Sequence, residues 1–249
     1  MYPILFEVGG VTIYSFGTLL AVAFIVGLVL SRYEMKERGF DPDLAYDLVL
    51  GVAVGSLIGA RLFYVVGHWG DYYSQNLLEI LRIWNGGLVF YGGLLGGALG
   101  LILIARGKQL NIFRLGDAIA APLALGTAIG RLGCFLNGCC YGIPAKAPFG
   151  VDFFGSGRYL PTQLVEMIWA LAMFGAIFFW LEKKVEFKSD GSLFLIYLAL
   201  YSFGRFFVEF IRYSSWKLLG ILSFAQLISV AVFAVSLYFI IRRRQEDLL

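Results

Sequence analysis

The sequence has few charged residues for its length. They make up 15% of its 249 residues, whereas hydrophobic residues make up 59%, and the mean hydropathy is +0.79. A soluble domain of this size needs more polar surface than that, so the composition excludes a soluble globular protein. The net charge of +3 is too small to indicate nucleic acid as a partner, and none is expected.

The N-terminus also lacks the basic segment that begins a secretory signal peptide, so we expect no cleavable signal. Long apolar runs are abundant instead, and several reach about 20 residues, enough to cross a bilayer core of roughly 30 Å. We predict an all-α, polytopic integral membrane protein in which residues 1–249 form a single seven-helix membrane domain. The expected helices span residues 12–31, 45–67, 86–105, 116–136, 163–181, 192–211 and 218–241.

Basic residues are unevenly distributed among the connections between these helices. Twelve lysines and arginines lie in the first, third and fifth connections and the C-terminal tail, and five lie in the other connections. Because basic loops stay on the cytoplasmic side of a membrane, this asymmetry predicts an external N-terminus and a cytoplasmic C-terminus.

Glycines recur at helical spacing in "GGLVFYGGLLGGALG". Gly92, Gly96 and Gly100 are four residues apart, with Gly93 and Gly97 beside them. Small residues at this spacing allow helix backbones to approach closely in lipid, so tight helix packing is expected. The preceding pair of glycines, at 86 and 87, indicates an irregular entrance to the helix.

Ionisable side chains inside the spans are the strongest functional signal, because such residues are costly in lipid and by default mark a site. With the predicted orientation they gather toward the outer ends of the helices, whereas Asp117 lies on the cytoplasmic side, where it can start the fourth helix. The outer group consists of Tyr14, Arg61, Tyr91, Arg131, Glu166, Arg205, Glu209 and Arg212.

We expect side chains of at least five helices to converge at this depth. Arg205, Glu209 and Arg212 share one helix face because they are spaced i, i+4 and i+7. The surplus of guanidinium groups favours an anion, and phosphate matches the planar fork best; phospholipid headgroups supply it at that depth. The alternative is a set of interhelical ion pairs, such as Arg205 with Glu209, with arginines reaching up to the interface.

All three cysteines lie in one segment, "GRLGCFLNGCCYG", residues 130–142. The C-x4-C-C spacing is unusual for metal ligands and His68 is the only histidine, so we expect no metal and no cofactor. A disulfide from Cys134 and small apolar filling remain alternatives to a nucleophilic thiol. Asn137 and Gly138 are expected to end the helix and turn backbone N–H groups toward an anion.

The same segment resembles the signature of bacterial prolipoprotein diacylglyceryl transferases, approximately G-R-x-G-N-F-x-N-x-E-x-x-G. Other stretches resemble that family's motifs in the same order over about 200 residues of the chain. They are "YSFG" from Tyr14, "GARLFYV" around Arg61, "WNGGLVFYGGLLGG" around Tyr91, "PTQLVE" from Pro161 to Glu166, and "GRFFVEFIR" from Gly204 to Arg212.

The resemblance implies a bacterial inner-membrane enzyme with its active site toward the outer leaflet. Such enzymes transfer diacylglyceryl from phosphatidylglycerol to the lipobox cysteine of a preprolipoprotein and release glycerol phosphate, so the implied partners are phosphatidylglycerol, the lipobox peptide and membrane lipids. By position, Arg131 would bind the lipid phosphate, Arg205 would assist its departure, and Glu209 would orient Arg205. The resemblance also implies substrate-binding positions at Tyr14, Arg61, Asn137, Gly142, Gln163, Glu166 and Arg212.

Three positions depart from the family pattern. Cys134 replaces asparagine, Cys139 replaces glutamate, and Tyr91 replaces histidine. If that histidine or glutamate deprotonates the acceptor thiol, this chain needs another route, because a phenol is a poor base at neutral pH. Glu209 or Glu166 could substitute as the base, or the thiol could ionise in the field of the arginines without a dedicated base. Tyr91 is kept as a catalytic candidate beside Arg131, Arg205 and Glu209. The alternatives are a diverged relative acting on another phospholipid or thiol acceptor, and a non-catalytic lipid-binding membrane protein.

Overall fold

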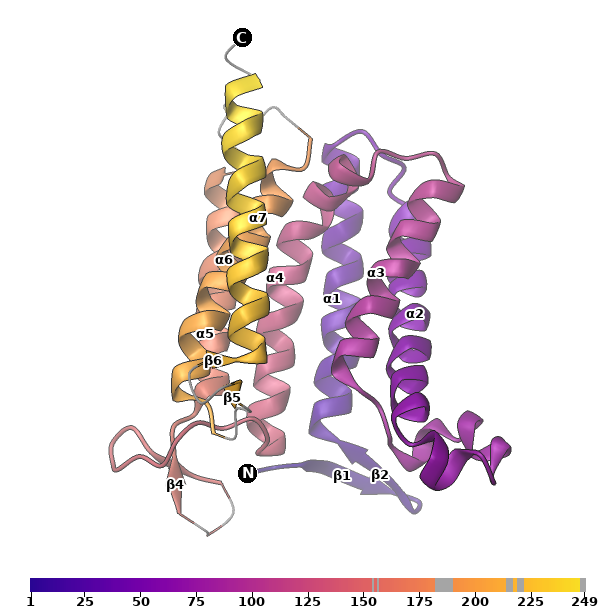
Figure 1. Cartoon of the computed structure of the whole chain (residues 1–249), viewed down its shortest axis with the longest axis vertical. Helices are drawn as coiled ribbons and strands as arrows, with labels where there is room; N and C mark the ends of the chain where they lie inside the picture. Colours follow the sequence, from indigo (N-terminus) through magenta and orange to yellow (C-terminus); the bar gives the residue numbers. More distant parts are fainter. Residues whose placement is uncertain (154, 156, 182–189, 214–216, 219–221, 247–249) are drawn as a thin grey trace. The chain divides into compact units, whose positions relative to one another are not determined.

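The structure, a computed structural model, describes residues 1–153, 155, 157–181, 190–213, 217–218 and 222–246. In this part of the chain seven helices are long and apolar enough to cross a membrane (Figure 1), which confirms the all-α, polytopic fold with seven spans. They are α1 (Ser15–Glu37), α2 (Leu44–Gly67), α3 (Phe90–Gly107), α4 (Ile112–Asn137), α5 (Thr162–Gly175) with its π-helical continuation η4 (Ala176–Leu181), α6 (Ser192–Ile211) and α7 (Phe224–Glu246).

Short elements connect these helices. Among the described residues, antiparallel hairpins pair β1 (Ile4–Val8) with β2 (Val11–Tyr14), β3 (Val151–Asp152) with β4 (Arg158–Tyr159), and β5 (Lys217–Leu218) with β6 (Leu222–Ser223). Between α2 and α3 lie a π-helical turn and two 3₁₀ turns: η1 (Trp69–Tyr73), η2 (Leu77–Leu81) and η3 (Ile83–Asn85).

Four predicted helix starts are wrong, those of the first, third, fourth and seventh helices. The fourth begins at Ile112 and not at residue 116. The first helix begins at Ser15, not at residue 12, because Val11–Tyr14 pairs as a strand. The third begins at Phe90, since Gly86 and Gly87 have φ angles of +82° and +78°, as an irregular entrance requires. The seventh begins at Phe224. Residues 219–221, in its predicted first turn, lie outside the described residues, as do the basic residues 183, 184 and 188 of the fifth connection.

The chain divides into two compact units. One contains Met1–Ser31 and Gly116–Leu249, and the other contains Arg32–Leu115. The prediction of a single membrane domain stays a prediction, and each unit is described by itself.

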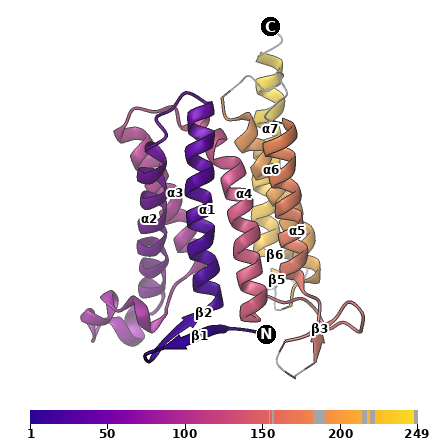
Figure 2. The same cartoon turned by 180° about the vertical axis from the view of Figure 1, so that it is seen from behind.

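In the unit of residues 32–115, α2 and α3 lie side by side (Figure 2). A Cβ atom built at Gly96 would collide with the carbonyl oxygen of Gly55, and one at Gly92 would collide with that of Gly59. The backbones therefore touch where glycines face each other, as expected for helix association in lipid. The predicted tight packing of the glycine run is confirmed, and α2 supplies matching glycines.

In the other unit, α4, α5 and α6 share a buried apolar core. Its centre is Ala120, Ala121 and Ala124 of α4, with larger side chains from the other two helices filling the space around them. Small residues on α4 let its neighbours approach closely. The surrounding side chains are Met173, Ile177, Leu193 and Tyr197, with Trp169 and Phe194 packed against them.

Asp117 has a different role from the one predicted. It lies inside α4, which Asn111 caps instead by accepting bonds from the N–H groups of Phe113 and Arg114. The Asp117 carboxylate accepts hydrogen bonds from the N–H groups of Gly191, at 2.6 Å, and Phe194, at 2.9 Å. It therefore satisfies N–H groups at the start of α6 and ties that end to α4.

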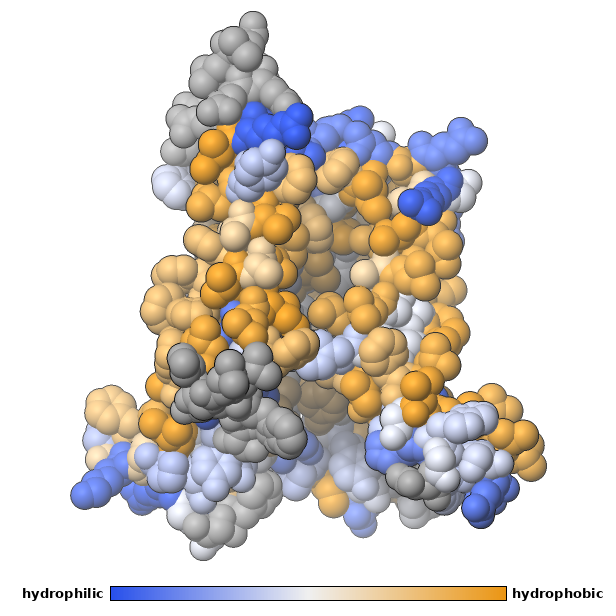
Figure 3. All heavy atoms as spheres, in the orientation of Figure 1, coloured by the Kyte–Doolittle hydropathy of each residue, from blue (hydrophilic) through white to orange (hydrophobic). Residues whose placement is uncertain are grey.

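The outer faces of the helices are apolar. On the face drawn in Figure 3, hydrophobic side chains cover the helices along most of their length, and hydrophilic ones gather near their ends. Many large apolar side chains are exposed along α2 and α3 as well, including Leu50, Ile58, Leu94 and Leu103. An apolar surface of this extent suits lipid rather than water as the surrounding solvent.

The glycine contact predicts that Gly96→Ala destabilises the protein. The added methyl group has no space against the Gly55 backbone, so α2 and α3 must separate, at a cost of about 1–3 kcal/mol. Thermal unfolding in detergent, followed by size exclusion, should show a lower midpoint. Gly27→Ala is the matched control, because a Cβ atom there meets nothing within 4 Å, and an equal loss in both variants would contradict the prediction.

Candidate functional site

Four charged side chains from three helices meet in the unit that contains α4 to α7. Glu166 of α5 lies between two arginines: its Oε2 is 3.1 Å from Nε of Arg131 on α4, and its Oε1 is 3.0 Å from an Nη of Arg205 on α6. Arg205 also pairs with Glu209, one turn further along α6, at 2.6 Å. Glu166 is therefore the bridge that joins the three helices.

The cluster is largely buried. The side chains of Glu166 and Glu209 are 9% and 6% exposed, and those of the two arginines 17% and 18%. Charges at this depth in an apolar protein need partners, and here two guanidinium groups face two carboxylates. The Arg205–Glu209 pair that the sequence offered as an alternative is present. The charges of these four residues balance, whereas the predicted surplus of guanidinium also counted Arg61 and Arg212.

Arg131 nevertheless keeps donors available. Its Nε faces Glu166, whereas no hydrogen bond or ion pair of its two Nη atoms occurs among the described residues. A small pocket lies beside it, lined by Thr127, Arg131, Glu166, Tyr201 and Arg205 together with apolar side chains. A guanidinium held at Nε presents both Nη groups as a fork, the geometry that suits a phosphate.

Gly204, the residue before Arg205, packs against Trp169 of α5. The indole N–H of Trp169 donates to the carbonyl oxygen of Leu200 at 3.0 Å, and the ring occupies the space that a side chain at Gly204 would need. Only glycine fits at position 204. Trp169 is not among the site residues predicted from the sequence, although a tryptophan three residues after Glu166 lies on the same face of α5.

Helix α4 ends in a tight turn immediately after Asn137. The N–H of Gly138, which has φ = +72°, donates to the carbonyl oxygen of Phe135, and that of Cys139 donates to the carbonyl oxygen of Cys134. This is a Schellman motif, in which glycine adopts the left-handed conformation. The predicted helix end is confirmed. The expectation that these N–H groups face an anion is wrong for Gly138 and Cys139, because both already donate within the turn.

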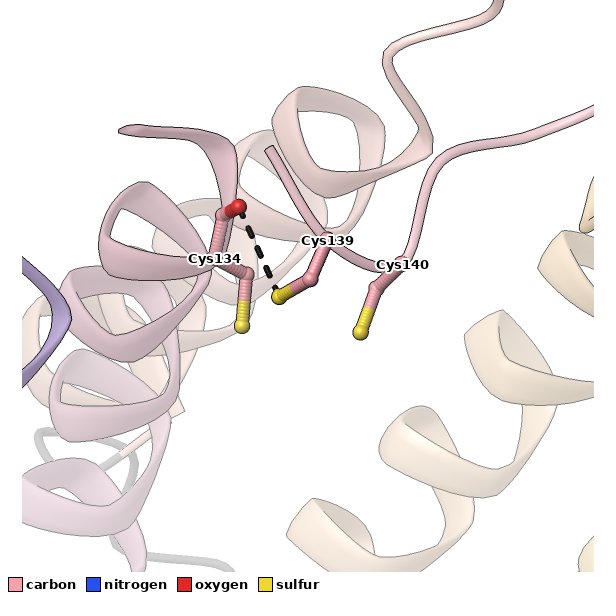
Figure 4. Close-up of side chains that lie close together, drawn as sticks. All are labelled: Cys134, Cys139 and Cys140. Atoms are coloured by element: carbon pink, nitrogen blue, oxygen red, sulfur yellow. Dashed lines mark hydrogen bonds between the residues drawn. The ribbon is translucent and has the colours of Figure 1, made fainter. Parts of the chain in front are cut away.

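The same turn gathers the three cysteines. Their sulfur atoms lie within 4.8 Å of one another, on one side of the turn (Figure 4), and all three are free thiols. Side-chain hydrogen bonds with Cys134 and Cys139, followed by the charges of Arg212 and Arg131, lower the pKa of Cys140, against the opposing effect of burial. The disulfide considered from the sequence is not formed.

The start of α5 holds this cysteine turn in place. The side-chain amide of Gln163, fully buried, donates to the carbonyl oxygen of Cys139 at 2.6 Å, and the hydroxyl of Thr162 donates to that of Cys140 at 2.8 Å. Gly142 follows, forming a bridge with Arg212, and a Cβ atom there would collide with the carbonyl oxygen of Ile211. Gln163 and Gly142, predicted near substrate, thus shape the rim of the site.

The remaining predicted site residues lie elsewhere. Arg61, in the unit of residues 32–115, donates to carbonyl oxygens of the segment from Glu79 to Gly87, including those of Ile80 at 2.9 Å and Gly86 at 2.6 Å. Tyr91 belongs to that unit too, and its ring contacts Phe90. Tyr14, largely exposed, ends β2 immediately before α1. The roles of these three residues stay predictions.

The chain is similar to proteins of the family that the sequence motifs resemble, along nearly its whole length. The family model described as prolipoprotein diacylglyceryl transferase matches residues 3–242. Proteins named phosphatidylglycerol–prolipoprotein diacylglyceryl transferase are similar to it: that of a Nostoc species is 36% identical, with 94% of this chain and 87% of the relative covered. Those of Acaryochloris marina and Staphylococcus xylosus are 37% and 34% identical, covering 92% and 97% of this chain and 85% and 89% of theirs.

The bridge at Glu166 predicts that Glu166→Gln lowers stability. The amide places an NH₂ group or a neutral oxygen opposite Arg131, leaving a half-buried guanidinium without its counter-charge, at a cost of about 1–3 kcal/mol. The unfolding midpoint in detergent should fall, and added sulfate should recover part of the loss. Asp47→Asn, at the exposed pair with Lys108, is the matched control, and a fall of the same size there would refute a special role for the bridge.

Proposed function

The chain belongs to the prolipoprotein diacylglyceryl transferase family, and from this we propose that it transfers diacylglyceryl from phosphatidylglycerol to the lipobox cysteine thiol of a preprolipoprotein. The observation that carries the proposal is the state of Arg131: its Nε pairs with Glu166 and its side chain lines a pocket inside a membrane protein. A phosphodiester headgroup is the lipid group that such a fork binds best.

The reaction exchanges one bond at a glyceryl carbon. The acceptor sulfur, as thiolate, attacks the carbon that carries the phosphate ester, a C–S bond forms and the C–O bond breaks, so that glycerol phosphate leaves with one more negative charge than the diester had. Because this charge develops on the phosphate in the transition state, preorganised guanidinium groups stabilise it more than they stabilise the bound substrate.

Each member of the cluster has a separate task in this scheme. Arg131 binds the phosphate through its Nη groups, and Arg205, across the same carboxylate, assists the departing phosphate. Glu166 and Glu209 hold the two forks in position and act as counter-charges before the lipid arrives. Asn137 and Gly142 keep the end of α4 and the following segment in the conformation that leaves the pocket open to substrate.

The seven spans and the family make this a multi-pass membrane protein. We place it in the cytoplasmic membrane of a bacterium, with the N-terminus outside, because twelve basic residues lie in the connections assigned to the cytoplasm and five in the others. Arg131, six residues before the end of α4, then lies toward the outer leaflet. The names of the relatives do not favour the alternatives of a different acceptor or a non-catalytic lipid-binding protein.

The direct test incubates the purified protein with phosphatidylglycerol and a lipobox peptide. We expect a diacylglyceryl mass increment on the peptide, and none on a peptide with serine in place of its cysteine, because oxygen is a far weaker nucleophile than a thiolate. Mass spectrometry of the peptide measures the result. Absence of the increment with the cysteine peptide, from protein that elutes as a folded species, would refute the proposed activity.

For the phosphate site, we expect Arg131→Lys to lower turnover about 10²–10³-fold, because lysine keeps the charge but loses the fork. Initial rates of peptide lipidation measure it. Arg106→Lys, the same exchange at an exposed residue near the end of α3, should leave the rate unchanged. Equal rates for Arg131→Lys and the unaltered protein would remove Arg131 from the site.

A further inference from the structure

We propose that Cys134, Cys139 and Cys140 form a zinc site whose fourth coordination position takes the thiol of the acceptor peptide as a thiolate. This inference rests on the proposed function, since it assigns the activation of the acceptor thiol to a cluster that the transfer reaction otherwise leaves without a task. It begins from the closeness of the three sulfur atoms, which lie within 4.8 Å of one another.

The turn after α4 explains how an unusual spacing yields a compact ligand set. The Schellman motif closes a ring between the N–H of Cys139 and the carbonyl oxygen of Cys134, 3.1 Å apart, which brings two residues five apart in sequence onto the same end of the helix. The Sγ of Cys139 lies 3.7 Å from that carbonyl oxygen, so its side chain points back toward Cys134 (Figure 4).

Cys140 completes the triad at a conformational cost. Its φ is +66°, a left-handed conformation that residues other than glycine rarely adopt and that is often found at functional sites. The hydroxyl of Thr162 holds its carbonyl oxygen at 2.8 Å. The neighbouring amide of Gln163 holds that of Cys139, so two residues of α5 anchor the two consecutive cysteines while their sulfur atoms stay directed to one side.

Three thiolates with a fourth position open are suited to Zn²⁺. Zinc takes cysteine ligands in tetrahedral geometry with Zn–S bonds of about 2.3 Å, and sites with three protein ligands keep one position for water or substrate. Tetrahedral angles at this bond length place sulfur atoms about 3.8 Å apart, so the triad closes around the ion after side-chain shifts of about 1 Å or less. Zinc has no redox chemistry, so it leaves the thiols reduced.

Activation of the acceptor thiol has no residue assigned to it in the arginine cluster, and the cysteine triad can supply it. The only histidine of the sequence is His68, whose Nδ1 lies 3.0 Å from the carbonyl oxygen of Tyr64. Both carboxylates of the cluster, Glu166 and Glu209, are engaged as counter-charges of arginines. A free thiol near pH 7 is mostly protonated, whereas a thiol bound to zinc is deprotonated.

The step balances without a further reactant. On binding to zinc the acceptor thiol releases its proton to water, and the zinc-bound sulfur then attacks the glyceryl carbon. As the C–S bond forms, the C–O bond breaks and glycerol phosphate leaves. The thioether product is neutral and binds zinc more weakly than the thiolate did, so it departs and the fourth position becomes available for the next peptide.

The cysteines and the phosphate site are built on the same helices. Cys134 lies one turn after Arg131 on α4, and Gln163, which anchors Cys139, lies one turn before Glu166 on α5. Residues three apart on a helix are neighbours on one face. The two contacts between α4 and α5, one at the arginine and one at the cysteine turn, thus hold the nucleophile site beside the leaving-group site.

This inference departs from the expectation, based on spacing, that no metal binds. In common ligand patterns the cysteines flank a loop, whereas here the end of α4 is itself the loop. The spacing C-x4-C-C is unusual along the chain but places all three sulfur atoms together once Gly138 turns it.

The first test measures the metal alone. The full chain, purified in detergent with a chelator and then given Zn²⁺, should retain one zinc ion per chain after dialysis, and each of Cys134→Ser, Cys139→Ser and Cys140→Ser should lower retention at least tenfold. Ala147→Ser, exposed in the same connection, is the control. Failure of the unaltered chain to retain zinc, or equal retention by the serine variants, overturns the site.

The second test examines the open position with Co²⁺ in place of zinc. Adding the lipobox peptide should strengthen the thiolate-to-cobalt charge-transfer absorption as a fourth sulfur binds, and the peptide with serine should not. This measurement uses the unaltered chain, so it tests whether the acceptor thiol binds the metal even if a serine variant does not fold. An unchanged spectrum with the cysteine peptide overturns the proposal.

Activity then separates this inference from the proposed function. Chelator-stripped protein should transfer diacylglyceryl at least tenfold more slowly than the same protein reloaded with Zn²⁺. Full activity of the stripped protein overturns the zinc role and leaves the transferase function intact. A cobalt spectrum that responds to the peptide, with no transfer by stripped or reloaded protein, supports the site and counts against the transferase function instead.

Discussion

A carboxylate between two guanidinium groups is the interaction on which the site depends. Glu166 faces Arg131 on one side and Arg205 on the other, and it lies in surroundings where an unpaired charge is costly. Because its partners belong to different helices, the bridge sets the relative position of α4, α5 and α6 at this level. The apolar core around Ala120 and Ala124 provides close packing, which does not by itself fix the orientation of one helix against another. The ion pairs do, because they require particular atoms to face each other.

The bridge also determines which nitrogen atoms of each arginine pair with a carboxylate. Arg205 directs its two terminal nitrogens at carboxylates, while Arg131 is held through Nε. A guanidinium fixed at one edge and available at the other is prepared for an anion before it arrives, so less of the binding energy is lost in ordering the side chain. A cluster with balanced charge can still serve as a phosphate site for this reason, since geometry rather than surplus charge makes the fork available.

The cysteine turn illustrates a second constraint, the need of a helix end to satisfy its last carbonyl groups. The Schellman motif does so with the N–H groups of Gly138 and Cys139, and the positions of the thiols follow from it. Gln163 and Thr162, at the start of α5, then donate to the carbonyl oxygens of Cys139 and Cys140. The pairing of these backbone groups gathers three sulfur atoms that the spacing in the sequence did not suggest as a ligand set.

The sequence by itself determined the elements that depend on composition and local pattern. Seven apolar runs of bilayer length, the glycine contact of α3, the pair Arg205–Glu209 and the helix end at Asn137 could all be predicted, because hydropathy, helical spacing and glycine conformations act over a few residues. Only the tertiary structure decided which residues meet across helices: Asp117 at the start of α6, Glu166 between two arginines, Arg61 among the carbonyl groups of its loop, and the closeness of three thiols. Such contacts depend on the rotation and depth of neighbouring helices, which are set by packing and by the pairing of buried polar groups. No local sequence pattern predicts them for this reason.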